Sequence, residues 1–224
     1  MMTLTHYGFR EWGTALLMAL LIFVVGWFVG GAVRVAVCVL AVVLWVAVAL
    51  FFRNPKRTAP DDDSLLVSPA DGLVRDIEEV DFSMAPFSGR ALRIGIFLSV
   101  LDVHVNRAPF AWKIMDKFYK EGRFLDARDP KCASENEAMT ISGIAGEDGF
   151  EFPMAVRQVS GAIARRIVCP PEAGAVFKRG DVYGMIKFGS RTELYIPVDA
   201  RFEVLVSPGD RVRGGETAVV KVKR

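Results

Sequence analysis

The sequence predicts an α+β protein that is mostly β, with an N-terminal hydrophobic helical hairpin followed by a β-rich domain that has barrel-sandwich-like halves. Residues 15–52 contain one charged side chain, that of Arg34, which favours long apolar helices. Beyond them, short apolar runs alternate with Gly, Pro and Asp, the pattern of many short strands. Two similar Pro-x-Asp turns, at 68–72 and 207–212, predict that the β-rich part has two related halves.

The apolar segments at 14–29 and 35–52 are expected to form the two helices, with Gly30-Gly31 in the turn between them. One helix crosses a bilayer with about 20 apolar residues. The whole apolar stretch, residues 15–52, is therefore too long for one pass and slightly short for two. The depth of insertion stays open. Arg53, Lys56 and Arg57 follow the second segment, so the positive-inside rule places both ends on the cytoplasmic side. A cleaved signal peptide fits less well, because no small-residue cleavage site follows the long apolar run.

The predicted domain boundary lies near residue 53, where a polar, proline-containing linker begins at Asn54. This gives a membrane-associated hairpin at 1–52 and a β-rich domain at 53–224. Within the second domain, the pattern allows one helix, either between Ala111 and Lys120 or around Ser134 to Met139.

Composition excludes several functional classes. The net charge of +2 and the lack of a basic stripe interleaved with aromatics argue against nucleic acid as a partner. The three cysteines, Cys38, Cys132 and Cys169, form no CxxC pair and a poor disulfide framework. With His6 and His104 as the only histidines, no metal site is expected.

Three side chains could together carry acyl chemistry. Ser190 follows Gly189 between two apolar runs, where it is either part of a hairpin turn or a nucleophile next to the Gly189 carbonyl. His104 is the one histidine of the β-rich domain, so it is either a core residue or the general base. Asp71 lies in a turn, where aspartate is commonly structural, but a serine–histidine pair also requires a carboxylate to orient the imidazole.

Four basic side chains are candidates for binding an anionic headgroup: Arg107, Arg165, Arg166 and Lys187. Arg165 and Arg166 are adjacent, so on a strand their side chains face opposite sides and at most one can enter a site.

Four segments in this order resemble the phosphatidylserine decarboxylase family, in particular its short bacterial form. They are Ser68-Pro69-Ala70-Asp71-Gly72, Asp102-Val103-His104-Val105-Asn106-Arg107-Ala108-Pro109, Ile163-Ala164-Arg165-Arg166-Ile167-Val168-Cys169 and Gly184-Met185-Ile186-Lys187-Phe188-Gly189-Ser190-Arg191. The resemblance covers residues 53–206 and is also consistent with the apolar N-terminus. The family usually has arginine at the position of Lys187.

The resemblance implies an enzyme that makes its own pyruvoyl cofactor. Asp71 would orient His104, and His104 would deprotonate Ser190, which attacks the Gly189 carbonyl. Cleavage between 189 and 190 would leave two chains held as a non-covalent heterodimer, with Ser190 converted to a pyruvoyl group. Through a Schiff base, that group would convert phosphatidylserine of the bilayer to phosphatidylethanolamine and CO2.

The family resemblance further implies attachment to an anionic membrane surface, namely a bacterial-type inner membrane with the catalytic domain on the cytoplasmic side. We expect an apolar mouth that faces the bilayer and is formed by Phe82, Met84, Phe87 or Phe110. Homo-oligomerisation stays open.

Two alternatives from other classes remain at this point. A membrane-anchored carrier or adaptor domain of the biotinyl or lipoyl type would be modified at Lys187. A conventional hydrolase would use Asp71, His104 and Ser190 in one intact chain, although the chain lacks the Gly-x-Ser-x-Gly elbow of α/β-hydrolases.

Overall fold

The computed structural model describes residues 2–126, 129, 131–147, 150–162, 166–187 and 190–223. It confirms the predicted class, because a pair of apolar helices precedes a mostly β part. Contacts divide the chain into two compact units, Met1–Lys56 and Arg57–Arg224.

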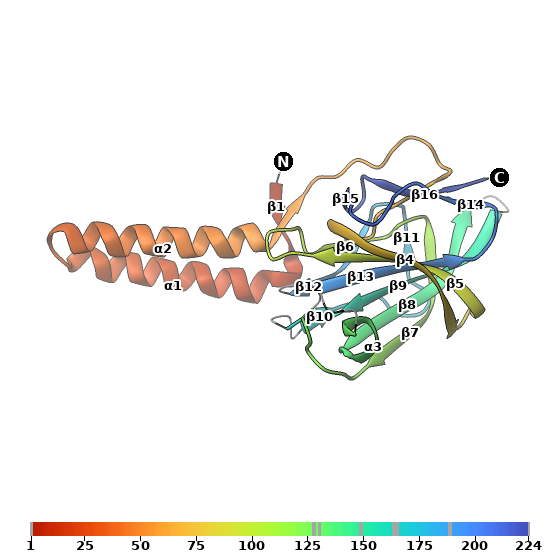
Figure 1. Cartoon of the computed structure of the whole chain (residues 1–224). Coiled ribbons are helices and arrows are strands. Elements are labelled where there is room, and N and C mark those ends of the chain that lie inside the picture. Colours follow the sequence, from red (N-terminus) through yellow and green to blue (C-terminus); the bar gives the residue numbers. More distant parts are fainter. Residues whose placement is uncertain are drawn as a thin grey trace. The chain divides into compact units, whose positions relative to one another are not determined.

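The first unit is the predicted helical hairpin (Figure 1). Helices α1 (Phe9–Phe28) and α2 (Gly31–Phe51) are joined at Gly30, and the short 3-10 helix η1 (His6–Gly8) precedes α1. Strands β1 (Met2–Leu4) and β2 (Arg53–Pro55) pair antiparallel at the base of the hairpin. Gly26 brings the helices close together, since a Cβ there would lie 3.0 Å from Val37 Cγ1.

Both helices of this unit are long and apolar enough to cross a membrane, by length and composition. Their apolar side chains are exposed, as at Leu17 and Leu40. The one charged residue of the predicted apolar stretch, Arg34, lies near the turn, where its Nε donates to the Val29 carbonyl at 3.0 Å. This placement leaves the middle of both helices free of charge.

The second unit contains an antiparallel sheet with eight strands among the described residues (Figure 1). From one edge to the other, the strands are β11 (Val176–Phe177), β7 (Trp112–Lys120), β8 (Ala138–Glu147), β9 (Phe150–Val159), β13 (Ser190–Pro197), β5 (Phe87–Leu98), β4 (Gly72–Met84) and β15 (Arg211–Val212).

Two smaller antiparallel sheets complete this unit in the described parts of the chain. One has the order β10 (Arg166–Val168), β12 (Val182–Lys187) and β6 (Val105–Arg107), and the other β14 (Phe202–Val204), β16 (Ala218–Val222) and β3 (Leu65–Val67). The two Pro-x-Asp turns noted in the sequence lie against each other, because Gly72 pairs with Val212 and the Val74 amide donates to the Asp210 carbonyl at 2.9 Å.

Strand β13 lies inside the large sheet, between β9 and β5. Its residues from Ser190 to Ile196 are all buried, so both faces of the strand are covered. On one face, Leu194 and Ile196 belong to the main core, together with Ile94 and Ile96 of β5. A shift by one residue would move Leu194 and Ile196 out of the core, so packing on this face fixes the register of the strand.

The prediction of a helix between Ala111 and Lys120 is wrong, because β7 occupies Trp112–Lys120. Its polar residues at 113, 116, 117 and 120 have helical spacing, but pairing with β8 along the whole strand overrides that local preference. A bulge between Ile114 and Asp116 breaks the period-2 pattern that marks a strand. The described helix of this region is α3 (Cys132–Glu135), which overlaps the second predicted position at Ser134.

The apolar run from Ala91 to Val105 is two strands and not one. Strand β5 ends at Leu98, and Asp102 closes a turn by accepting hydrogen bonds from the Ser99 amide at 2.8 Å and the Ser99 hydroxyl at 2.7 Å. The chain then enters β6 in another sheet, so His104 directly precedes a short strand.

We predict that Ile141→Ala, in the middle of β8, destabilises the β-rich unit by about 2–5 kcal/mol, because it leaves a cavity in the core. Met115→Ala on β7, where the side chain is half exposed, should change stability by less than about 0.5 kcal/mol. Thermal unfolding of the full chain in detergent, followed by circular dichroism, measures both. Equal losses in the two variants would contradict the core assigned here.

Candidate active site

Ser190 is the first residue of β13, and its side chain is fully buried. It lies opposite Leu98 of β5, and its neighbours at alternate positions on the same face, Thr192 and Leu194, point toward the core. Its Oγ makes no hydrogen bond with the described residues. Most buried hydroxyls in proteins do have such a partner. Gly189, the other half of the predicted cleavage site, lies outside the described residues.

His104 is fully buried as well. Its Nδ1 lies 3.0 Å from the carbonyl oxygen of Asp102. A carbonyl oxygen can only accept, so this hydrogen bond holds a proton on Nδ1 and fixes the ring. In the neutral imidazole, Nε2 then carries the lone pair that a general base needs.

The backbone brings His104 into the neighbourhood of Ser190. Ile186 of β12 lies four residues before Ser190 in the chain, and its amide donates to the His104 carbonyl at 3.1 Å. On the other side, β5 pairs with Ser190 through Leu98, and the Ser99–Asp102 turn leads directly to His104. Two chain connections therefore converge on the same region.

Asp71 lies in the turn before β4, where its carboxylate accepts two hydrogen bonds. Its Oδ2 is 2.6 Å from Arg57 Nη2, and its Oδ1 is 2.7 Å from the Gly214 amide. Arg57 also binds Glu216 at 2.7 Å. From the sequence, Arg57 is only a positive charge after the second apolar segment, and no local signal links it to Glu216, which lies 159 positions away. The catalytic role of Asp71 stays a prediction.

The four predicted headgroup-binding residues fall in different places. Arg107 on β6 is buried and donates to the Gly180 carbonyl at 3.0 Å. Burial lowers the pKa of Arg107, with nearby Arg57 adding to this effect and Asp71 opposing it. Lys187, buried at the end of β12, pairs in register with the exposed Arg166 at the start of β10. Arg165 lies outside the described residues.

A buried polar group beside Ser190 was missed in the sequence. Asn106 Nδ2 donates to Thr192 Oγ1 at 3.0 Å, and Gln158 Nε2 donates to Asn106 Oδ1 at 2.8 Å. All three side chains are fully buried, and Gln158 Oε1 makes no hydrogen bond within the described parts of the chain. Amide and hydroxyl groups in a core have to be hydrogen-bonded to be tolerated, which ties β6 to β9 and β13 at this point.

The thiols of this unit are poor alternatives as nucleophiles. Burial raises the pKa of Cys169 to about 12 and also raises that of Cys132. Because the thiolate is the reactive form, both side chains are chemically inert near neutral pH.

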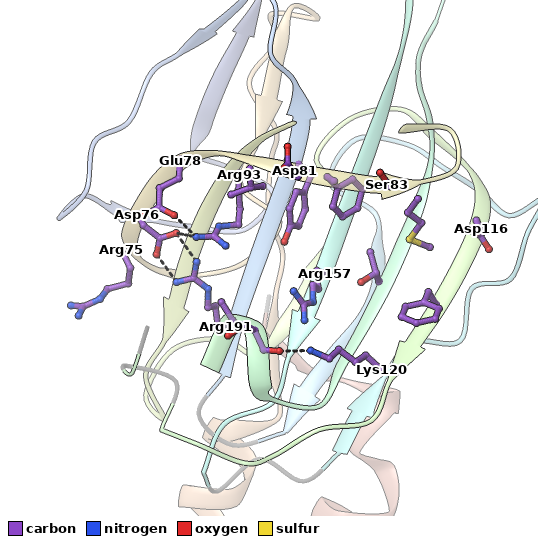
Figure 2. A pocket seen from close by; sticks show the side chains of 18 of the residues that line it. Arg75, Asp76, Glu78, Asp81, Ser83, Arg93, Asp116, Lys120, Arg157 and Arg191 are labelled. Atoms are coloured by element: carbon purple, nitrogen blue, oxygen red, sulfur yellow. Dashed lines mark hydrogen bonds and ion pairs between the residues drawn. The ribbon is translucent and has the colours of Figure 1, made fainter. Parts of the chain in front are cut away.

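A cavity of about 890 Å³ is lined by Arg191 of β13 (Figure 2). Because side chains alternate along a strand, it lies on the opposite face of β13 from Ser190. Arg191 and Tyr195 of β13 line it together with charged residues of β4, β5 and β9. Phe82 and Met84 line this cavity, whereas Phe87 and Phe110 are buried. The expectation of Phe87 and Phe110 in an exposed apolar mouth is therefore wrong: Phe110 packs in the main core with Phe152, at a ring separation of 5.8 Å.

Comparison with known proteins gives a consistent result. A sequence model of the phosphatidylserine decarboxylase family matches residues 46–220. A phosphatidylserine decarboxylase proenzyme of Geotalea daltonii is 40% identical over 92% of this chain and 89% of its own length. Proenzymes of the same name from Carboxydothermus hydrogenoformans (44% over 82% of this chain and 84% of its own) and Symbiobacterium thermophilum (44% over 87% and 92%) are similar. The chain thus belongs to the phosphatidylserine decarboxylase family and is a decarboxylase.

Proposed function

We propose that the chain cleaves itself between Gly189 and Ser190, and that the resulting pyruvoyl enzyme converts phosphatidylserine to phosphatidylethanolamine and CO2 at a membrane. The relatives carry the word proenzyme in their name, which fits a precursor that matures by cleavage.

The observation that carries this proposal is the state of the Ser190 side chain. It is fully buried and its Oγ has no hydrogen bond among the described residues. Such a hydroxyl is available to attack the peptide bond that directly precedes it in the chain. The buried His104 lies in the same region, with Nδ1 already engaged by the Asp102 carbonyl.

In the proposed reaction, His104 Nε2 takes the proton of Ser190 Oγ, which attacks the carbonyl carbon of Gly189. The amide C–N bond breaks, the Ser190 nitrogen takes up a proton, and an ester replaces the peptide bond. Loss of the Ser190 Cα proton then expels Gly189 as a carboxylate. Water replaces the nitrogen, which leaves as ammonia, and the new chain end becomes a pyruvoyl group.

When formed, the pyruvoyl group supplies an electron sink for the charge left at Cα by the loss of CO2. The residues around the pyruvoyl group would bind the substrate and return a proton to its Cα. The exposed Arg166 is the better candidate for the phosphate, because Arg107 is held by the Gly180 carbonyl and Lys187 is buried. His104 is suited to return a proton to Cα, since the same ring nitrogen that accepts a proton can donate it.

A membrane setting fits both the substrate and the N-terminal unit. The two apolar helices would anchor the chain in a bacterial-type inner membrane, with the β-rich unit on the cytoplasmic side and against anionic lipid. The two cleavage products, residues 1–189 and 190–224, would remain a heterodimer because β13 is paired on both sides.

The two alternative functions have less support. A hydrolase would keep one intact chain, whereas the relatives are named decarboxylase proenzymes. A carrier lysine must be exposed so that it can be modified and can move between sites, whereas Lys187 is 5% exposed.

We predict that the purified wild-type chain gives two polypeptides in intact-mass spectrometry under denaturing conditions. The smaller would begin at position 190 and be lighter, by one ammonia, than the product of simple hydrolysis. Ser190→Ala should stay as one chain, because no hydroxyl can attack Gly189. An active wild-type preparation with a single intact chain would contradict the pyruvoyl mechanism.

We predict that His104→Asn slows cleavage by roughly 10²–10⁴-fold, the usual contribution of a general base. If Asp71 orients the imidazole, Asp71→Asn should also slow cleavage strongly, while Arg57→Met, which removes the ion-pair partner of Asp71, should do so weakly. The cleavage rates of the three variants are compared by measuring the fraction of cleaved chain over time after expression. Equal slowing by Asp71→Asn and Arg57→Met would assign Asp71 a structural role.

We predict that the paired substitution Leu17→Lys and Leu40→Lys moves the chain out of the membrane fraction. A lysine near the middle of a membrane helix costs about 2.5–3.5 kcal/mol, and both positions are exposed. The matched control replaces the same two leucines by alanine, which adds no charge. Flotation of cell membranes measures the distribution, and unchanged flotation of the lysine variant would contradict insertion into the hydrocarbon core.

A further inference from the structure

The residue after Ser190 is held by an ion-pair network on the other face of β13. Side chains alternate along a strand, so Ser190 and Thr192 share the core face, while Arg191, Glu193 and Tyr195 share the face toward the cavity. Arg191 is 4% exposed and Glu193 is fully buried. Charges buried this deeply have to be paired to be tolerated.

The pairing of Arg191 is bidentate. Its Nη1 and Nη2 donate to the two carboxylate oxygens of Asp76, both at 2.6 Å (Figure 2). Its Nε donates to Glu193 at 2.8 Å. Tyr195 completes the network by donating to the second oxygen of Glu193 at 2.6 Å. A planar guanidinium facing a carboxylate with two parallel hydrogen bonds fixes orientation as well as distance.

The charges of these groups are stabilised accordingly. Burial raises the pKa of Asp76, but the hydrogen bond and charge of Arg191 outweigh it, and the pKa lies below its ordinary value. Burial likewise lowers the pKa of Arg191, and the hydrogen bonds and charges of Asp76 and Glu193 more than offset that effect. The pair is therefore fully ionised at neutral pH.

Two backbone features make room for this contact. A bulge between Val74 and Asp76 shifts β4 by one residue, so Asp76 pairs with Gly95 and faces the cavity; without it, Asp76 would face the core like Val74. Gly95 of β5 lies under the ion pair, and a Cβ there would be 2.0 Å from Arg191 Nη2 and 2.7 Å from Asp76 Oδ1. The contact thus spans β13, β5 and β4 across a glycine.

The proposed cut gives this ion pair a special position. Asp76 would belong to the product 1–189, while Arg191 would be the second residue of the product 190–224. The end of a newly cut chain tends to fray unless it is tied down. We propose that the Asp76–Arg191 pair anchors the new chain end, so that the reactive group made from Ser190 keeps its place in the mature enzyme. This proposal rests on the proposed self-cleavage.

Arg191 is a positioning residue in this view, because it lies on the opposite face of β13 from the reactive position. Its conservative variant, Arg191→Lys, keeps the charge but loses the two-pronged contact with Asp76. Gly95→Ala is a second variant that removes no charge and displaces the guanidinium by its added methyl group.

Arg93→Lys serves as the matched control. Arg93 Nη2 also binds Asp76, at 3.2 Å, and Glu78 at 2.6 Å, and all three residues fall in the product 1–189. Its link to the other product is a 3.9 Å ion pair with Glu193. Arg93→Lys therefore weakens the hydrogen bonds to the same carboxylates, but it changes the contacts between the two cleavage products little.

The experiment compares each variant in the cleaved enzyme and in the uncut Ser190→Ala background. Intact mass first establishes cleavage, and titration of the carbonyl group counts active sites. Turnover of phosphatidylserine in mixed micelles then gives kcat and KM per carbonyl. Thermal melting and native mass spectrometry report the stability of the chain and the release of the product 190–224.

We expect Arg191→Lys and Gly95→Ala to be cleaved, with kcat per carbonyl reduced on the order of 10- to 100-fold, as for a misplaced reacting group, and KM little changed. Their loss of melting temperature should be larger in the cleaved enzyme than in the uncut background, with earlier release of the small chain. Arg93→Lys should show neither effect.

Equal losses of melting temperature in the two backgrounds, with unchanged kcat per carbonyl, would overturn the proposal and leave an ordinary structural ion pair. Failure of both variants to be cleaved would also overturn it, because the contact would then act before the cut. An uncut wild type is a separate outcome, since it removes the proposed function itself and is seen in the first mass spectrum.

Discussion

The burial of β13 on both of its faces is the constraint on which the rest of the site depends. One face contributes to the main core, and the other carries an ion-pair network beside the cavity, so the strand can neither slide nor rotate. A register shift by one residue would place Arg191 in the core and Leu194 in the cavity. Ser190 lies at the start of β13 and is therefore positioned by contacts along the whole length of this strand.

The polar groups near Ser190 divide into two kinds. Asn106, Gln158 and Thr192 hydrogen-bond one another and join three strands. Ser190 Oγ is left without such a bond among the described residues, while the His104 ring is oriented by a backbone carbonyl. A buried hydroxyl without such a bond in the described parts of the chain is consistent with chemistry directed at the chain itself.

Local patterns in the sequence predict much of this structure. The uninterrupted apolar stretch and its glycine pair predict the helical hairpin. The single histidine of the β-rich part and Ser190 lie in one region of the fold, and their catalytic roles stay predictions. The strand at 112–120 is not predictable in this way, because its bulge breaks the alternation and its stability comes from β8. The partners of Arg191 and Asp71 lie far away in the chain, and no local signal reveals which carboxylate or guanidinium will meet them.

The central place of β13 also bears on how the protein can mature. Under the proposed cut, the fragment 190–224 contributes a strand that lies between β9 and β5 of the other fragment. Such a strand assembles readily while it is still tethered, because closing a loop within one chain costs far less entropy than joining two separate chains. Folding must then precede cutting, and the uncut precursor acts as its own assembly template. Once denatured, the mature enzyme would lack that template, so its lifetime would be governed by the rate of unfolding and not by an equilibrium.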